Sequence, residues 1–196
     1  MRVGEPINFI PFNGDSLLHG EIGRLIGKWG VEVAVETGTY HGSTTVALSL
    51  LCSKVFTFEN IPENSNIAES IFETLNRGNI YLIRQSSDKG ISDLVDDLKG
   101  HRVIYYLDAH WQDHWPLLNE LKAIAMIGGP KPIIVIHDFK VPGRPELGFD
   151  CYKNSVLNLD YVSEEIDKIF QGRSCFHFNS LALGKRRGAI FIEPEM

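Results

Sequence analysis

The sequence predicts a doubly wound α/β fold, in which a mostly parallel seven-stranded sheet is covered by helices on both faces. Short β-branched runs alternate with segments of helical periodicity, and this alternation requires crossover connections between parallel strands. The runs are apolar at nearly every position, which is typical of strands buried on both faces. Two further runs near the end of the chain, with glycines between them, predict an antiparallel hairpin at the edge of the sheet.

The predicted elements follow one another in a regular order. Apolar residues at helical spacing predict a first helix over 17–29, which Asp15 or Ser16 can cap. The parallel strands are predicted at 31–35, 55–58, 80–83, 103–107 and 133–136. The connecting helices are predicted at 43–51, 67–75, 91–98 and 115–126. A last helix over 161–170 leads to the hairpin strands 175–178 and 189–192.

Length and charge limit the classes of function that the chain can serve. A chain of 196 residues fits one domain with a buried core, and residues 1–14 are expected to lead into it. The net charge of −6 disfavours nucleic acid as the main partner, because its phosphates would be repelled. The one basic cluster, Lys185-Arg186-Arg187, is expected to lie in a solvated turn.

The charged N-terminal residues, the lack of a long apolar run and the few cysteines predict a cytoplasmic protein that does not enter a membrane. Early charges at Arg2 and Glu5 argue against a signal peptide, and no apolar run approaches the roughly 20 residues of a membrane span. Cys52, Cys151 and Cys175 are few and widely spaced, so they predict neither a disulfide framework nor a metal knuckle. A reducing compartment is therefore expected, and a homo-oligomer is compatible with these features.

A carboxylate ends or follows each of the five predicted parallel strands. In chain order these residues are Glu36, Glu59, Asp88, Asp108 and Asp138. The carboxyl ends of parallel strands meet at one edge of the sheet, where ligands bind near the switch in strand order. Clustered carboxylates repel one another and need a cation or hydrogen bonds. The sequence therefore predicts a site for a positively charged ligand at this edge.

The turn after the first strand helps to choose the ligand. Its spacing, Glu36-x-Gly38-x-x-x-Gly42, is not the Gly-x-Gly-x-x-Gly of dinucleotide sites, and the carboxylates would repel a pyrophosphate. A ligand with a sulfonium and an ammonium group suits such surroundings. Gly38 and Gly42 would allow close backbone approach, and the helix N-terminus at Ser43 could receive a carboxylate. Glu59, about 20 residues further on, has the spacing of a residue that binds ribose hydroxyls.

Four segments resemble motifs of the class I S-adenosylmethionine-dependent methyltransferases. Residues 35–45, VETGTYHGSTT, resemble the first motif, and residues 56–59, FTFE, resemble the second. Residues 106–111, YLDAHW, and 134–139, IVIHDF, resemble the later strand-end motifs. The terminal hairpin matches the seven-stranded sheet of this family, and the resemblance extends over about residues 15–193.

The resemblance implies methyl transfer from S-adenosylmethionine to a small-molecule acceptor. The small-molecule O-methyltransferases are the most similar subgroup, which makes a hydroxyl oxygen the expected methyl acceptor. Glu36, Gly38 and Gly42 would contact the methionine part of the cofactor, and Glu59 its ribose. Ser86, Ser87 or Asp88 would lie on the adenine side, and Thr37, Ser43 and Asp108 complete the expected cofactor-binding set.

Two other classes of function stay open. A nicotinamide-dependent oxidoreductase would also have a Rossmann-like sheet, but the glycine spacing and the terminal hairpin count against it. A non-catalytic cofactor-binding protein would keep the fold without turnover, because a fold alone does not establish a function. Binding of S-adenosylmethionine rather than NAD would exclude the first class, and turnover would exclude the second.

The strand-end residues also provide candidates for catalysis. An oxygen acceptor must lose its proton to a general base or through a metal that lowers its pKa. Asp108, His110 and Asp138 are the candidate catalytic residues, and the imidazole of His110 is suited to base catalysis. Some O-methyltransferases hold a divalent metal on strand-end aspartates, so Asp108, Asp138 and His137 are candidate ligands for Mg²⁺ or Mn²⁺. The pair His137-Asp138 stands where several such enzymes have two acidic residues, which leaves the metal open.

The segment 141–158 is predicted to be an active-site loop. It is rich in Pro, Gly and Asn, and it begins directly after His137-Asp138. Phe149 and Tyr152 could contact an acceptor or anchor the loop. Trp111 and Trp115 could line an acceptor pocket, although packing of the helix that follows them is the stronger expectation.

Overall fold

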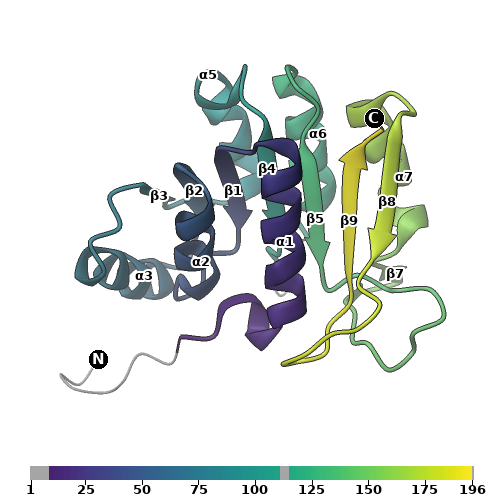
Figure 1. Cartoon of the computed structure of the whole chain (residues 1–196), viewed down its shortest axis with the longest axis horizontal. Helices are drawn as coiled ribbons and strands as arrows, with labels where there is room; N and C mark the ends of the chain where they lie inside the picture. Colours follow the sequence, from purple (N-terminus) through teal and green to yellow (C-terminus); the bar gives the residue numbers. More distant parts are fainter. Residues whose placement is uncertain (1–8, 111–114, 196) are drawn as a thin grey trace.

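The computed structural model describes residues 9–110 and 115–195. Its seven-stranded sheet has the order β3-β2-β1-β4-β5-β9-β8 (Figure 1). Five strands are parallel: β1 (Val33–Thr37), β2 (Lys54–Phe58), β3 (Ile80–Ile83), β4 (Val103–Leu107) and β5 (Ile133–His137). β9 (Ala189–Pro194) runs antiparallel between β5 and β8 (Ser174–Phe178). The predicted fold class is confirmed, and the strand order switches direction between β1 and β4.

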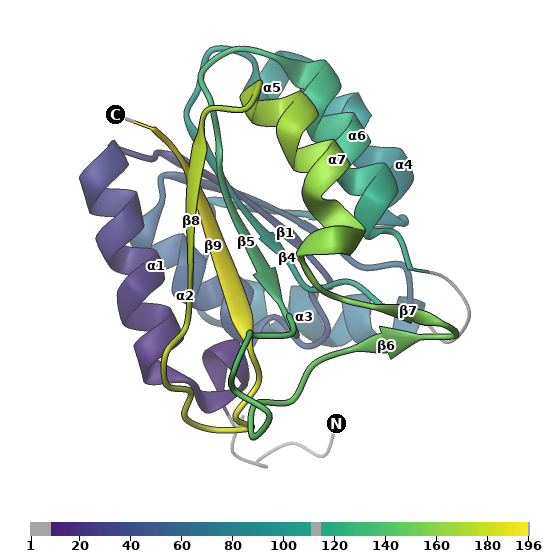
Figure 2. The ribbon, with the colours of Figure 1, turned by 90° about the vertical axis from the view of Figure 1, so that its right-hand side faces the viewer.

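Helices cover both faces of this sheet. α1 (Ser16–Trp29) and α2 (Ser43–Leu51) lie on one face, whereas α6 (Leu117–Ile127) and α7 (Leu159–Phe170) lie on the other (Figure 2). α3 (Pro62–Thr74) packs beside α2 and against β3. The short elements α4 (Ser87–Gly90), η2 (Ile91–Leu94) and α5 (Val95–Leu98) pack on the face of α6.

Side chains on the two faces of the sheet form two separate hydrophobic cores. Successive side chains of a strand point to opposite faces of the sheet. Val35 and Tyr105 therefore join the core under α6 and α7, whereas their neighbours Ala34 and Ile104 join the core under α1. All four side chains are buried. Burial on both faces explains why the strands carry continuous apolar runs.

Most predicted elements occur with shifts of one or two residues at their ends. Asp15 caps α1, because its carboxylate accepts the N–H groups of Leu17 at 3.0 Å and Leu18 at 3.1 Å. α3 begins at Pro62, five residues before the predicted start, and proline is preorganised for the first turn of a helix. The prediction of one helix over 91–98 is wrong. Leu94, with φ −88° and ψ 7°, separates η2 from α5.

The predicted loop 141–158 contains a short hairpin that the sequence did not indicate. β6 (Cys151–Tyr152) pairs antiparallel with β7 (Ser155–Val156). The first part of the loop is anchored, because Val141 and Leu147 are buried together with Ala182 from the segment before β9. The loop leaves the carboxyl end of β5, on the edge of the sheet where the ligand site is predicted (Figure 2).

Membrane and disulfide features can be stated for the described residues. No helix in residues 9–110 and 115–195 is long and apolar enough to cross a membrane. The three cysteines all lie in this part of the chain and are free thiols.

Candidate functional site

A cavity of about 600 Å³ opens at the carboxyl ends of the parallel strands. Its wall comes from the segments that follow β1 to β5, from the turn before β9 and from Asn13 near the N-terminus. Of the predicted site residues, Gly38, Glu59, Ser86, Ser87, Asp108, His110 and Asp138 line it. The structure therefore brings residues from five strand ends together, as the strand order requires.

Gly38 is a glycine because the backbone that follows β4 approaches it. It lines the cavity and has φ +87°, a left-handed conformation that favours glycine. A Cβ atom at this position would lie 2.9 Å from the carbonyl oxygen of Asp108. The lack of a side chain at Gly38 is therefore needed for the fold before any ligand arrives.

Gly42 and Ser43 lie outside the wall of the cavity. Gly42, with φ +82°, is the N-cap of α2. A Cβ atom on it would come within 2.5 Å of the Phe72 ring in α3. Helix packing, rather than ligand approach, accounts for this glycine. Ser43 is the first residue of α2 and is half-buried.

Glu36 and Thr37 are buried beneath the surface rather than exposed in the cavity. One carboxylate oxygen of Glu36 accepts the hydroxyl of Thr57 at 2.6 Å and also that of Thr45. Burial raises the pKa of Glu36 to about 8, although these hydroxyls partly oppose the rise. The carboxyl group is therefore largely neutral at pH 7. Thr37 accepts the backbone N–H of Asp108 at 3.2 Å and so ties β1 to β4.

Glu59 joins the turns that follow β1 and β2. Its two oxygens accept the backbone N–H groups of Tyr40 and Ile61, each at 2.8 Å. The residue is buried apart from its contribution to the cavity wall. A carboxylate has about four acceptor positions, so Glu59 can still accept hydrogen bonds from a ligand.

The segment after β3 is held by a carboxyl group that the sequence analysis missed. Ser86 donates to the carboxylate of Asp88 at 2.5 Å, and Ser87 donates to Glu120 of α6. Glu120 is fully buried, and burial raises its pKa to about 7. An acidic residue beside Leu121, on the apolar face of the predicted helix, was the available signal for this contact.

His137 lies between two carboxylates at the end of β5. Its Nδ1 is 3.1 Å from an oxygen of Asp108 and 3.1 Å from an oxygen of Asp138. Burial alone would lower the pKa of His137, but the two aspartates outweigh burial and raise it to about 10. The side chain is therefore an imidazolium at neutral pH. Asp108 also accepts the hydroxyl of Tyr106 at 3.4 Å and lines the cavity.

Arg187 is the main site residue that the sequence analysis did not identify. Its Nε donates to Asp138 at 2.5 Å, and its Nη2 donates to Asp150. Burial opposes ionisation of Asp138, but the charges and hydrogen bonds of His137 and Arg187 hold its pKa well below the usual range. A carboxylate with so low a pKa is a weak base, so the structure gives Asp138 an electrostatic role.

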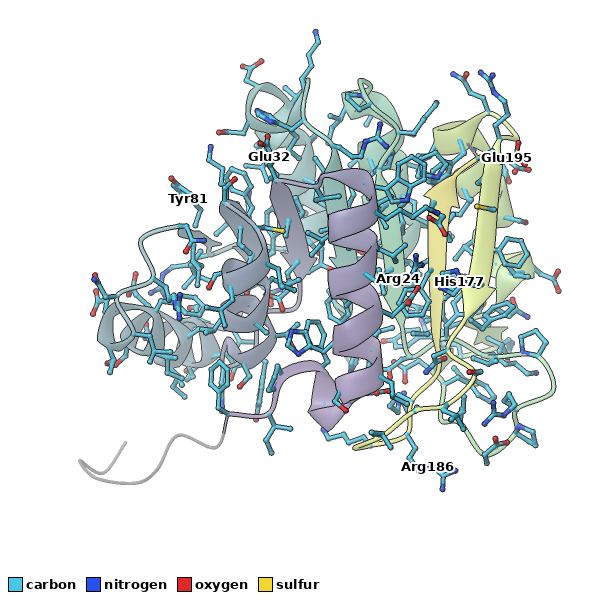
Figure 3. All side chains as sticks on the ribbon, viewed as in Figure 1. Arg24, Glu32, Tyr81, His177, Arg186 and Glu195 are labelled. Carbon is cyan, nitrogen blue, oxygen red and sulfur yellow. The ribbon has the colours of Figure 1, made fainter. Side chains whose placement is uncertain are left out.

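The prediction of a solvated basic turn is confirmed for Lys185 and Arg186, which are exposed, but not for Arg187, which is half-buried. Arg186 projects into solvent beyond the β8–β9 connection (Figure 3). Lys185 is exposed at the cavity wall, and Arg187 also lines the cavity. The flanking glycines were the available signal: a side chain at Gly188 would overlap the backbone of Phe139, so this turn packs closely on the segment after β5.

His110 and the aromatic residues near it divide between the cavity and the core. The His110 side chain is 56% exposed, and its Nδ1 is 3.8 Å from Asp150. Trp115 stacks on Tyr161 of α7, with ring centroids 4.7 Å apart, and also lies near Tyr152. Packing is therefore the role of Trp115. Trp111, the other predicted wall residue, lies outside the described residues.

Asp150 is the residue of the predicted loop 141–158 that lines the cavity. Tyr152 instead lies against Trp115, and the Phe149 ring lies 5.4 Å from the ammonium of Lys140. Both aromatic residues therefore anchor the loop.

The three predicted ligands do not fit a divalent metal. Ligand atoms of Asp108, His137 and Asp138 do lie within 4.8 Å of one another. However, the protonated Nδ1 of His137 lies between both aspartates, and the guanidinium of Arg187 is hydrogen-bonded to the Asp138 carboxylate. A metal ion would have to displace both positive charges, and metal-binding histidine must be neutral. The geometry therefore does not support this metal site.

No protein-family model and no curated protein matches the sequence. Solved structures do match the fold. The O-methyltransferase from Bacillus cereus, in complex with SAH (S-adenosylhomocysteine), has a TM-score of 0.68 at 16% identity, over 92% of this chain and 81% of that chain. An rRNA methylase from Streptococcus thermophilus has a TM-score of 0.57 at 15% identity, over 92% and 95% of the two chains.

A third match shows that this fold also occurs with other reactions. The precorrin 8W decarboxylase from Methanobacterium thermoautotrophicum has a TM-score of 0.54 at 14% identity, over 90% of each chain. Likeness at these identities concerns the fold, and the reaction must be argued from the site. The strand order, the terminal hairpin and these matches together lead to one conclusion: the chain has the fold of the class I S-adenosylmethionine-dependent methyltransferases.

Proposed function

We propose that the protein transfers the methyl group of S-adenosylmethionine to a hydroxyl oxygen of a small-molecule acceptor. The observation that supports this most directly is the cavity itself. It lies at the switch in strand order, and Glu59 lines it from the turn that closes over the glycine segment of β1. The fold provides independent support, because the matched structures include an O-methyltransferase with bound SAH.

The β2 and β3 side of the cavity suits a nucleoside. Glu59 can accept the two ribose hydroxyls with the lone pairs that Tyr40 and Ile61 leave free. Phe58 and Ile61 supply apolar surface, and Ser86 supplies a hydroxyl, as a flat heterocycle with polar edges requires. We therefore assign the ribose to Glu59 and the adenine to this wall.

The β1 and β4 side suits the methionine part of the cofactor. Gly38 and Asp108 line the cavity at the ends of these adjacent strands, so a carboxylate lies where the ammonium group would bind. Glu36 and Thr37 support this pair from below through Thr45, Thr57 and the Asp108 backbone. Their proposed role is to position Asp108 and the glycine turn.

The reaction is an in-line displacement. The acceptor oxygen attacks the methyl carbon, the carbon–sulfur bond breaks, and S-adenosylhomocysteine leaves as a neutral thioether. Most of the rate enhancement comes from holding the oxygen opposite the sulfonium. The acceptor proton passes to the imidazole of His110, which lies on the cavity wall. Asp138 is a poorer base because its carboxylate is held by Arg187 and His137.

Calorimetric titration of the purified protein tests which cofactor binds. We expect S-adenosylmethionine and S-adenosylhomocysteine to bind and NAD not to bind. Glu59→Gln should raise the dissociation constant of S-adenosylhomocysteine at least ten-fold. Glu63→Gln is the matched control, because Glu63 is an exposed carboxylate in the first turn of α3. A folded Glu59→Gln protein that binds as tightly as the parent contradicts the assignment, and so does binding of NAD alone.

Turnover separates an enzyme from a non-catalytic cofactor-binding protein. Transfer of a labelled methyl group from S-adenosylmethionine to a panel of hydroxylated small molecules should identify an acceptor.

A further inference from the structure

Positive charge lines the end of the cavity away from the proposed nucleoside site. Within the described part of the chain, Lys185 and Arg187 are the cationic lysine and arginine side chains in its wall. Both come from the turn before β9, whereas Glu59 lies on the β2 side. This end also contains His110, the proposed base. An acceptor bound here would therefore meet a lysine and an arginine.

The two cations are in different electrostatic states. Arg187 is paired with Asp138 and Asp150, so its charge is offset and both carboxylates are occupied. The ammonium of Lys185 has no hydrogen-bond or ion-pair partner among residues 9–110 and 115–195. Lys185 therefore presents an uncompensated positive charge on the cavity wall.

The backbone under Lys185 is fixed by two contacts with the N-terminal turn η1 (Pro11–Gly14). The N–H of Lys185 donates to the carbonyl oxygen of Asn13 at 3.2 Å. Gly184 has φ +58°, and a side chain there would overlap the same carbonyl. This close approach places Lys185 beside Asn13, which also lines the cavity.

Contacts with the sheet and with α2 anchor η1. Phe12 is fully buried, and its ring meets Tyr106 of β4 edge-on with centroids 5.4 Å apart. The N–H of Phe12 donates to the hydroxyl of Thr44 in α2 at 2.9 Å. A flexible side chain on a fixed backbone can reach an anion without ordering a loop first, so the site is partly preorganised.

We propose that the acceptor is a small hydroxylated anion, whose carboxylate or phosphate group binds Lys185 next to Asn13. This inference rests on the proposed methyl transfer. An ion pair at Lys185 would hold one end of the acceptor and leave its hydroxyl to face His110 and the sulfonium. The carboxylates of Asp138 and Asp150 both hydrogen-bond Arg187, and the His137 imidazolium also lies 3.1 Å from Asp138, so their repulsion of such an anion is partly offset.

The test uses SAH-saturated protein and two minimal probes, inorganic phosphate and acetate. Backbone amide signals of Lys185 and Asn13 are followed by NMR during each titration. We expect saturable shifts at both residues, and the probe that binds more tightly identifies the anionic group. Lys185→Met should raise the dissociation constant at least ten-fold, and Lys185→Arg should restore binding. Arg186→Met, a neighbouring cation that projects into solvent, should leave it within two-fold (Figure 3).

The outcomes separate this inference from the function on which it rests. Binding of SAH is measured first by calorimetry. Its absence overturns the proposed function and this inference together. Binding of SAH without saturable phosphate or acetate shifts at Lys185 overturns this inference alone. Equal anion affinity in the parent and a folded Lys185→Met variant does the same.

Discussion

Replacing Glu36 by Gln should remove one large contribution to the pH dependence of the protein's stability. Burial raises the pKa of this carboxyl from 4.5 to about 8, against the opposing hydrogen bonds of Thr45 and Thr57. The folded protein therefore keeps a proton that the unfolded chain releases above pH 4.5. The stability that depends on this proton is complete below pH 4.5 and is lost as the pH rises to about 8.

The size of the effect follows from the two pKa values. At 1.36 kcal/mol for each tenfold change in proton affinity, the full loss is about 5 kcal/mol, and about 3 to 4 kcal/mol of it falls between pH 5 and pH 8. Gln cannot ionise, and its amide oxygen can still accept the hydroxyls of Thr45 and Thr57. The variant should therefore retain the contacts and lose the pH dependence of this group.

Urea denaturation at several pH values between 5 and 8.5 measures the difference. The free energy of unfolding of Glu36→Gln relative to the parent should rise by about 4 kcal/mol across this range. Glu32→Gln is the matched control, because Glu32 precedes the same strand but is exposed at the opposite end of the sheet (Figure 3). Parallel pH profiles for the parent and Glu36→Gln, within about 1 kcal/mol, would refute the reasoning.

Four further predictions concern the site. Gly38→Ala should lower the free energy of unfolding by about 2 to 3 kcal/mol, because its Cβ would meet the Asp108 carbonyl. Gly30 also has a positive φ but has open space around it, so Gly30→Ala should lower the free energy of unfolding by only about 1 kcal/mol. Arg187→Met should lower the free energy of unfolding by about 2 kcal/mol in urea denaturation, because it removes an ion pair from each of two neighbouring aspartates. Once an acceptor is identified, His110→Ala should lower kcat about 100-fold or more while calorimetry finds S-adenosylhomocysteine bound as in the parent. Turnover should survive exhaustive chelation, since the donor set does not fit a divalent ion.

Each of these four has a result that contradicts it. Equal stability of Gly38→Ala and Gly30→Ala would mean that the Asp108 backbone moves freely. An Arg187→Met protein as stable as Arg186→Met would remove the ion-pair argument. Parent-like turnover by His110→Ala would require another base. Loss of turnover on chelation, restored by Mg²⁺ or Mn²⁺, would return a metal to the site.

The sequence by itself determined the order of the elements and the edge of the sheet at which the cavity opens. Alternating apolar runs and helical segments predict crossovers, and crossovers predict a parallel sheet whose carboxyl ends meet at one edge. Glu59, Asp108 and His110 could be located in this way, because each needs only to follow a strand. Capping of α1 by Asp15 was equally predictable, since it depends on contacts within three residues.

Tertiary structure alone decided what the charged groups of the site do. Glu36 is neutral rather than part of an acidic cradle because two other elements bury it. Arg187 reaches back 49 residues to Asp138, and Glu120 reaches back 33 to Ser87. Ionisation and pairing depend on burial and on distances between residues remote in the chain, and local periodicity carries no information about either.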